Sequence, residues 1–559
     1  MSSLLGNLQS IAEQQLQFLW QKAEPLLQPL LENEQWKPYA ITLGVLGPLS
    51  YVFYKNYIDN LYLNPLNRLP GPPIGWDALF MLGNFRAITV AETARPQLDW
   101  TEKYGGIIRY YGLFNIPRVM VSDPELLKQI LVTHQYDFVK PKELAEFIGK
   151  ILGVGLLVAE GAEHRHQRKM LNPVFSVNAI RGMVPDMFVP GKRLVDAWTE
   201  ELNNGEKELN ILNGLSRATL DVISINGFGY DYASSVPGAP PNDLNEAYNR
   251  VFAGSDVFIR ILFAIFPIMR KLPLKRNIEF RKAIKTIDTE SMKLVTEARK
   301  RSSGEKQGSG RKATRDLLSI MTKERDEASG EGMDDNALQA QIMTFLAAGH
   351  ETTSVTVTWA LHELSQHPEV QDQLREEIKS VFSNINYDHP LFADPISVDE
   401  SELAGANIPS FDEINNLPFL NNVVKEILRL IPPVPMTNRT VEKDIVVGGY
   451  LFPKGARVFI PPAVTQRMTS AWGDDGLKFR PSRWDEPLAQ AAGPYTYMPF
   501  LAGGRQCIGY RFALIEIKIL LGVLINAFKF TAKPGVEIKK RQAITWRPSP
   551  DLILYAERV

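Results

Sequence analysis

The sequence predicts a mainly α-helical protein with small β-sheets. Between residues 76 and 559, apolar residues recur mostly at helical spacing, and segments with the alternation of a β-strand are few and short. The same stretch shows no internal repeat and no second linker. With 45% hydrophobic and 22% charged residues, the composition is that of an ordinary globular chain. We therefore expect one large, mainly helical domain rather than a disordered or fibrous protein.

Charge and cysteine content exclude several classes of protein. The chain of 559 residues has 62 basic and 63 acidic residues and a net charge of -1, whereas a protein that binds nucleic acid over its surface is usually basic. We therefore expect no nucleic-acid partner. The single cysteine excludes an intrachain disulfide framework and every zinc cluster built on several cysteines.

An uncharged run near the N-terminus extends from Pro38 to Tyr54, between Lys37 and Lys55. Its 17 residues are at the short end of the roughly 17–25 that span a bilayer. We expect a single transmembrane anchor at residues 38–54, with a buried hydrophobic helix as the alternative. A cleaved signal peptide is disfavoured because the run lies far from Met1.

The segments on either side of this run have separate interpretations. In residues 1–37, apolar residues at helical spacing indicate either an amphipathic helix at a membrane surface or a weakly ordered leader. Residues 55–75 include four prolines from Pro65 to Pro73, which predict a stiff linker. The globular domain is expected at residues 76–559.

Short segments of alternating or β-branched residues predict the small sheets. The predicted strands are residues 107–111, 118–121, 445–447, 450–452, 457–460, 543–547 and 552–556. Gly448 and Gly449 suit a tight turn between two of them. The last two strands are expected to pair as a C-terminal hairpin across Pro548-Ser549-Pro550.

A long helix is predicted at residues 334–367. Asp334 or Asp335 can cap its start, and Pro368 ends it. Its middle is apolar nearly all round, which is typical of a buried central helix.

The segment from Phe500 to Gly509 surrounds the one cysteine, Cys507. Its glycines permit a tight loop and a close approach of the backbone to a flat ligand. A helix is expected at residues 510–527, so Cys507 precedes a helix N-terminus, and Arg505 adds a positive charge; both favour a thiolate. Such a thiolate suits axial ligation of heme iron. The alternative is a structural cysteine in a tight turn.

The spacing F-x-x-G-x-R-x-C-x-G is carried by Phe500, Gly503, Arg505, Cys507 and Gly509. It resembles the heme-binding loop of the cytochrome P-450 monooxygenases, and the resemblance extends over nearly all of residues 69–559. It implies the cytochrome P-450 fold for the catalytic domain and a heme (iron protoporphyrin IX) whose axial ligand is the thiolate of Cys507.

The segment Ala348-Gly349-His350-Glu351-Thr352-Thr353 resembles the family's oxygen-activation motif. By this resemblance Glu351 and Thr352 are the catalytic pair that delivers protons, with room for dioxygen beside Ala348 and Gly349. The alternative is that the threonines only hydrogen-bond back along the helix and bend it.

A further match is the E-x-x-R pair Glu426 and Arg429, on a helix expected between Pro418 and Pro432. Together with Arg483 it would form a structural triad that supports the cysteine loop.

The two heme propionates require positive charge. By family position, Arg168, Arg439 and Arg505 supply it. His164 occupies the place usually held by tryptophan and could donate a hydrogen bond, with a partly exposed helix histidine as the alternative. Gln466 stands where many relatives have histidine.

The resemblance implies a heme-dependent monooxygenase that inserts one atom of O2 into a hydrophobic small molecule, such as a terpenoid or another secondary-metabolite intermediate. An NADPH-cytochrome reductase would supply electrons, with cytochrome b5 as a second candidate partner. Substrate contacts are expected from residues 138–155, 256–273, 345–346 and 434–437. The long leader resembles that of fungal members, and the anchor places the domain on the cytoplasmic face of the endoplasmic reticulum membrane. The alternatives are a heme-thiolate isomerase or dehydratase that needs no reductase, a fatty-acid or xenobiotic hydroxylase, and a protein whose heme is inert.

Overall fold

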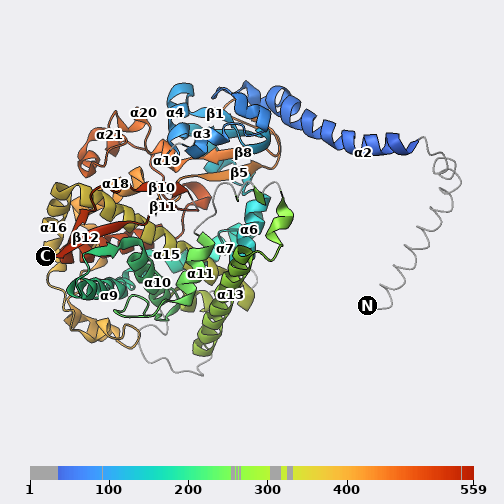
Figure 1. Ribbon diagram of the computed structural model, residues 1–559. Helices are drawn as coiled ribbons and strands as arrows, with labels where there is room; N and C mark the ends of the chain where they lie inside the picture. Colours follow the sequence, from blue (N-terminus) through green and yellow to red (C-terminus); the bar gives the residue numbers. More distant parts are fainter. Residues whose placement is uncertain are drawn as a thin grey trace, which may run out of the picture.

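The fold is seen in a computed structural model of the chain (Figure 1). It describes residues 36–90, 92–252, 259, 262–263, 266–302, 316–323, 332–542 and 544–559. Most of the leader, residues 1–35, lies outside the described residues. The same is true of much of the expected substrate-contact segment 256–273.

The N-terminal helix α2 (Trp36–Phe53) projects from the globular body (Figure 1). Within the described part of the chain, no helix combines the length and the apolar composition required to cross a bilayer. The predicted anchor at residues 38–54 is therefore wrong, and so is the endoplasmic reticulum location that depended on it. The run lacks charge, but Gly44, Gly47, Pro48 and Ser50 dilute its apolar content.

The segment expected to be a stiff linker is partly helical. A π-helix, η1 (Tyr54–Leu63), continues α2 and is followed by a short 3-10 helix, η2 (Pro65–Arg68). The hydroxyl of Tyr57 donates to the carbonyl of Leu79 at 2.6 Å, and Leu66 is buried in the body. The segment is thus attached to the globular part, while the domain boundary at residue 76 remains a prediction.

The largest sheet has five strands in the order β1-β2-β8-β5-β3. These are β1 (Ile107–Tyr111), β2 (Pro117–Val121), β8 (Arg457–Ile460), β5 (Thr437–Val441) and β3 (Phe138–Val139). Strands β6 (Ile445–Val447) and β7 (Tyr450–Phe452) form a separate hairpin. Gly448 and Gly449 turn this hairpin with φ of 57° and 83°, a conformation that glycine adopts without strain.

The expected C-terminal hairpin does not form. Strand β11 (Trp546–Ser549) pairs with β10 (Lys539–Gln542), whereas β12 (Ile553–Arg558) pairs with β9 (Phe528–Ala532) and β4 (Glu208–Asn210). The alternation in Phe528–Ala532, with both phenylalanines buried, provides a partner strand that the sequence prediction did not include.

Helices make up most of the body and enclose one large apolar core. In chain order they are α3 (Phe85–Val90), α4 (Arg95–Tyr104), α5 (Pro124–Lys128), α6 (Lys142–Leu152), α7 (Gly161–Leu171), α8 (Val177–Arg181), α9 (Val184–Asn203), α10 (Ile211–Phe228), α11 (Asp243–Phe252), α13 (Lys275–Ser302), α14 (Leu317–Lys323), α15 (Asp335–Gln366), α16 (Pro368–Phe382), α17 (Phe411–Asn415), α18 (Pro418–Leu430), α19 (Pro462–Thr465), α20 (Thr469–Trp472), α21 (Pro487–Gln490) and α22 (Tyr510–Ala527).

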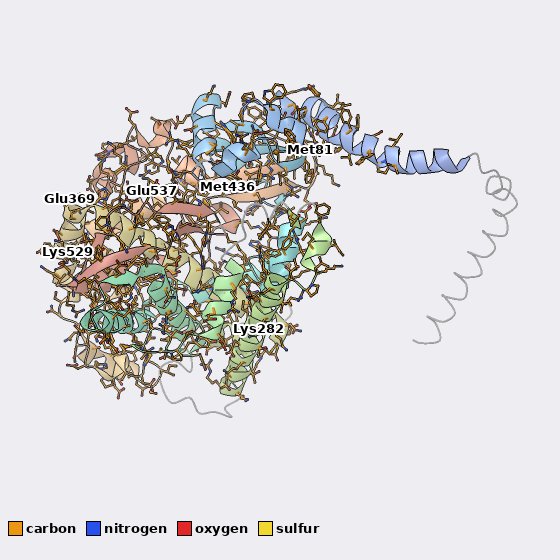
Figure 2. All side chains as sticks on the ribbon, viewed as in Figure 1. Met81, Lys282, Glu369, Met436, Lys529 and Glu537 are labelled. Atoms are coloured by element: carbon orange, nitrogen blue, oxygen red, sulfur yellow. The ribbon has the colours of Figure 1, made fainter. Side chains whose placement is uncertain are left out.

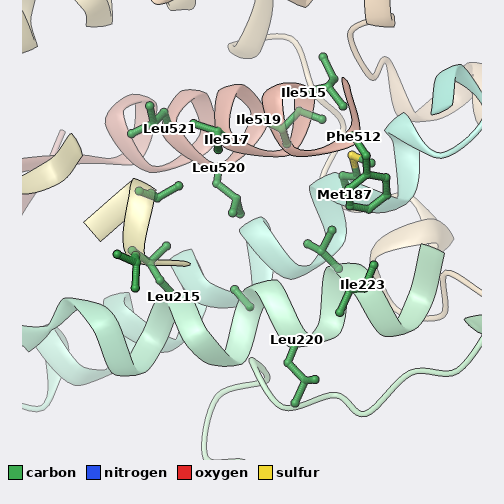
Figure 3. Close-up of a cluster of buried hydrophobic side chains, with 14 of the residues drawn as sticks. Met187, Leu215, Leu220, Ile223, Phe512, Ile515, Ile517, Ile519, Leu520 and Leu521 are labelled. Carbon is green, nitrogen blue, oxygen red and sulfur yellow. The ribbon is translucent and has the colours of Figure 1, made fainter. Parts of the chain in front are cut away.

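Apolar side chains of α9, α10 and α22 meet in this core. Figure 3 shows Leu215 and Ile223 of α10 on the side that faces α22, with Met187 close to Phe512. All four side chains are buried, so their packing fixes α22 against the interior. Figure 2 shows charged side chains such as Lys282 around the outside of the same body.

Helix α15 runs through the centre of the body, as predicted. The Asp334 side chain caps it by accepting from the amide of Ala337 at 2.7 Å, and the helix ends before Pro368. Every residue from Leu338 to Leu361 is buried except Ala348, Gly349 and Thr352. Between residues 338 and 361 the helix is therefore enclosed by protein everywhere but at this one step.

Candidate functional site

The loop around Cys507 is tight and depends on one glycine in particular. The amide of Cys507 donates to the carbonyl of Phe500 at 2.9 Å, which closes the loop just before α22. Gly503 has a φ of 73°, and a Cβ atom there would lie 2.1 Å from the carbonyl oxygen of Leu131. No other residue type fits this position without displacing the backbone.

The side chain of Cys507 is exposed, although protein surrounds it closely enough that burial raises the pKa of its thiol. A hydrogen bond from the Gly509 backbone and the charge of Arg168 oppose that rise in pKa without overcoming it. The charge that favours the thiolate thus comes from Arg168, and not from Arg505 as expected. A thiol in this setting loses its proton when a metal ion binds the sulfur.

The predicted cationic residues surround the approach to this loop. Arg168 donates from Nη1 to the carbonyl of Gln506, next to Cys507, at 2.6 Å. Arg505 donates to the carbonyl of Ala159 at 2.8 Å and forms an ion pair with Glu160. Arg168 therefore supports the cysteine loop directly, while Arg505 faces α7.

The surroundings of Arg439 on β5 show whether an anionic cofactor fits beside the cysteine loop. Its side chain donates to the hydroxyl of Thr437 at 2.9 Å and to the carbonyl of Asn438 at 2.8 Å, and among the described residues it has no ion pair. Arg439 is only 5% exposed, and burial lowers its pKa to about 10. A buried guanidinium without a carboxylate is costly, so a ligand with acidic groups, such as the heme propionates, fits this position.

His164 on α7 is buried, which contradicts the alternative of a partly exposed helix residue. Its Nδ1 lies 3.2 Å from the hydroxyl of Tyr136. Burial and the neighbouring positive charges lower its pKa to about 3, so the ring is neutral. His164 can therefore exchange a hydrogen bond here but contributes no charge.

Three residues of this cluster were missed by the sequence interpretation: Tyr136, Lys140 and Glu160. Lys140 lies 3.4 Å from a Glu160 carboxylate oxygen, and burial together with the charge of Arg505 lowers its pKa to about 7. The side chain of Tyr136 contacts His164 and has the Arg505 guanidinium over its ring. No motif marks these residues, because only the fold brings β3 and α7 beside the cysteine loop.

Thr352 lies on the accessible step of α15, as the motif predicts. Its hydroxyl donates back to the carbonyl of Ala348 at 2.7 Å. Because that hydroxyl remains accessible, it can accept a further hydrogen bond from a molecule beside Ala348 and Gly349.

Glu351 faces a different direction and is fully engaged. Its Oε1 accepts from the Thr545 hydroxyl at 2.6 Å and from Nε of Arg547 at 2.8 Å, and its Oε2 forms an ion pair with the same guanidinium. Burial alone would raise the pKa of Glu351, but Arg547 outweighs it and the pKa is lowered. The structure does not join Glu351 and Thr352 by a hydrogen bond, and Arg547 and Thr545 carry no sequence motif.

The structural triad is assembled in full. Arg429 donates to both carboxylate oxygens of Glu426 at 2.8 Å, and Arg483 donates to the same carboxylate at 3.3 Å. Gln466, in the place of the usual histidine, accepts from the Met498 amide at 2.9 Å and donates to the Leu428 carbonyl at 2.9 Å. These bonds attach the chain that leads into the cysteine loop to α18.

Comparison with known proteins agrees with this geometry. The family model described as Cytochrome P450 matches residues 72–555. The chain belongs to the cytochrome P450 family.

Several of the P450 relatives that the chain resembles are fungal. The chain is 34% identical to Cytochrome P450 monooxygenase 205 of Postia placenta, over 91% of this chain and 94% of the relative. It is 30% identical to Cytochrome P450 monooxygenase sphH of Aspergillus fumigatus, with 92% of each chain covered. It is 33% identical to Cytochrome P450 monooxygenase claW of Ampulloclitocybe clavipes, over 84% of this chain and 87% of the relative.

Membership identifies the protein as a P450 monooxygenase, an oxidoreductase with a heme-thiolate cofactor. It also implies a reductase as redox partner and a small molecule as substrate. Since the chain has one cysteine, the candidate for the thiolate is Cys507.

Proposed function

We propose that this P450 inserts one oxygen atom of O2 into a hydrophobic small molecule, a terpenoid or another secondary-metabolite intermediate, within a catalytic domain at residues 76–559. Electrons come from an NADPH-cytochrome reductase, with cytochrome b5 as a second donor. The observation that carries the proposal is the accessible Thr352 at the one open step within residues 338–361 of α15, in a chain whose only cysteine is also exposed.

The chain's own residues have separate roles in binding the cofactor. Cys507 would provide the thiolate that holds the heme iron, and Phe500, Gly503 and Gly509 shape the loop that presents it. Arg439 and Arg505 bind the propionates, and Arg168 holds the loop through the Gln506 carbonyl. His164 contributes a neutral hydrogen bond beside them. Heme bound in this way supplies the activation of dioxygen and the oxidation of the substrate.

Thr352 and Glu351 handle protons in this proposal. The Thr352 hydroxyl can turn from the Ala348 carbonyl, to which it now donates, toward a ligand at the open step. It then passes its proton to that ligand. Glu351 resupplies that hydroxyl. The acid–threonine pair favours a monooxygenase over an isomerase or dehydratase.

A hydrophobic substrate is supported by the apolar side chains that remain exposed in the 138–155 segment. Leu144 and Phe147 on α6 and Val154 after it are all exposed. Apolar surface of this kind favours an apolar ligand over a charged one. The fungal relatives support the monooxygenase class.

The test is reconstitution of the purified protein with heme, NADPH and a reductase. Candidate substrates come from comparing the metabolites of cells with and without the protein. We expect substrate-dependent NADPH oxidation and a product that carries one labelled atom from labelled dioxygen. Product formed without NADPH and reductase would support the isomerase instead, and heme that never consumes NADPH would show it to be inert.

A further inference from the structure

The carboxylate of Glu351 is held by a strand far away in the sequence. Arg547, on β11, donates to both of its oxygens, and both side chains are almost fully buried. Thr545 adds a third hydrogen bond to the same carboxylate. Successive residues of an α-helix point about 100° apart, so a carboxylate fixed against β11 is turned away from the Thr352 hydroxyl.

Arg547 has a second acceptor besides Glu351. Its Nη2 donates to the side-chain oxygen of Asn249 on α11 at 3.1 Å. Asn249 in turn donates to Asn245 at 3.1 Å, which accepts from the Ser216 hydroxyl of α10 at 2.8 Å. The guanidinium is therefore anchored to α11 independently of Glu351 and keeps a hydrogen-bond partner if the carboxylate leaves.

The remaining charge around Glu351 is small. His350, the preceding residue on α15, is buried and its pKa is lowered to about 4 by burial, so the ring is neutral near neutral pH. Arg541, the cross-strand partner of Arg547 on β10, is exposed. Arg547 is thus the group that keeps Glu351 ionised, and an ionised carboxylate has no proton to give.

We propose that Arg547 is the positioning residue for Glu351: it holds the carboxylate ionised against β11 and must release it before Glu351 can take up a proton and pass it to Thr352. This inference rests on the proposed function, because it assigns the control of that proton supply. Asn249 retains the guanidinium when the carboxylate turns away. The Arg547–Glu351 ion pair therefore controls proton supply in addition to linking α15 to β11.

The first measurement does not use activity. Infrared absorption of the heme-loaded protein at neutral pH reports protonated buried carboxyl groups. Without Arg547, burial favours the neutral form of Glu351, and the hydrogen bond from Thr545 is the remaining contact that favours the ionised form. We expect a new protonated-carboxyl band in Arg547→Gln, no such band in Arg541→Gln, and loss of the band in the double variant Arg547→Gln with Glu351→Gln. Absence of the band in a heme-loaded Arg547→Gln protein would overturn the proposal.

The second measurement follows NADPH oxidation with the reductase in normal and heavy water. Because Glu351 no longer has to leave an ion pair, the solvent isotope effect falls in Arg547→Gln, and Arg541→Gln keeps the wild-type value. An unchanged isotope effect in Arg547→Gln would overturn the proposal. If Arg547→Gln does not fold, Arg547→Lys takes its place: lysine keeps the charge but holds the carboxylate at one point only, so Glu351 leaves more easily and we expect a smaller isotope effect than in wild type. An unchanged value in this variant would likewise overturn the proposal.

These results separate this inference from the proposed function. If Thr352→Ala changes the release of peroxide but Arg547→Gln alters neither readout, the monooxygenase proposal stands and the role of Arg547 fails. If the reconstituted protein never oxidises NADPH, the proposed function fails while the infrared band still reports on Arg547.

Discussion

Thr353 of α15 donates a 3.0 Å hydrogen bond to Glu516 of α22, nine residues after Cys507 in the sequence. Glu516 is only 1% exposed, and its second oxygen, Oε1, has no partner among the described residues. Burial raises its pKa well above that of an ordinary glutamate. Two buried carboxyl groups at α15, Glu351 on the helix and Glu516 facing it, thus have pKa values shifted in opposite directions, that of Glu351 being lowered and that of Glu516 raised.

The raised pKa of Glu516 predicts a pH dependence of stability. In the folded protein Glu516 binds its proton more tightly than in the unfolded chain, so it lowers the free energy of unfolding as pH rises above the usual glutamate range, by up to about 1.4 kcal/mol per pH unit. Glu516→Gln has no such proton to lose. We expect the difference in stability between Glu516→Gln and wild type to grow in favour of the variant as pH rises. Denaturant unfolding at several pH values measures it, and a constant difference would contradict the assignment.

Thr352→Ala removes the accessible hydroxyl of α15. We expect the variant to keep its heme. The amount of product formed per NADPH should fall by about 10²–10⁴-fold, with the electrons released as hydrogen peroxide instead. Thr352→Ser should restore coupling. Thr356→Ala removes another back-bonded threonine one turn along the helix and serves as the control. Peroxide formed per NADPH is the measurement, and coupling that is unchanged in Thr352→Ala would remove Thr352 from the proton path.

Gly503→Ala tests the geometry of the cysteine loop. A Cβ atom at this position meets the Leu131 carbonyl oxygen and the backbone has a positive φ, so we expect a loss of about 1–3 kcal/mol in stability together with poor heme loading. Gly493→Ala, where a Cβ meets nothing within 4 Å, should behave as wild type. Thermal unfolding and the heme-to-protein absorbance ratio report the outcome. Equal stability and equal heme loading in the two variants would show that the loop does not require glycine at position 503.

Arg439→Leu removes a buried guanidinium from the proposed propionate site. Because its charge has no ion pair in the part of the chain that the structure describes, we expect the variant fold to be at least as stable as wild type without heme. We also expect it to lose heme faster, by about tenfold or more for a charge-assisted hydrogen bond of about 1.5–3 kcal/mol. Arg457→Leu, on the neighbouring strand and paired with Glu143, is the control. Transfer of heme to a heme-free acceptor protein gives the rate, and an unchanged rate would place the propionates elsewhere.

Sequence patterning located the elements but not all of their partners. The bounds of α22, β6, β7 and β8 agree with the predicted segments because each is bracketed by glycine, proline or a clear change of period. The C-terminal hairpin was wrong because alternation shows that a strand exists, not what it pairs with. The anchor was wrong because the absence of charge in residues 38–54 was given more weight than their glycines and proline.

In the candidate site, too, the sequence indicates residues within contiguous motifs but not the partners that the fold brings to them. Cys507, Thr352 and Gly503 belong to contiguous motifs, so the chain itself indicates their surroundings. Arg547 and Tyr136 have no such signal, since they reach Glu351 and His164 only through the fold. The partner of Arg505 was missed for the same reason: Glu160 lies 345 residues away in the sequence.

The most direct measurement is the absorption spectrum of the reduced carbon monoxide complex of wild type and Cys507→Ser. We predict the spectrum of a thiolate-ligated heme in wild type and its loss in Cys507→Ser, with Gly493→Ala retaining it. A thiolate-type spectrum that persists in Cys507→Ser, or a wild-type protein that stays colourless after heme is added, would contradict a heme held by this cysteine.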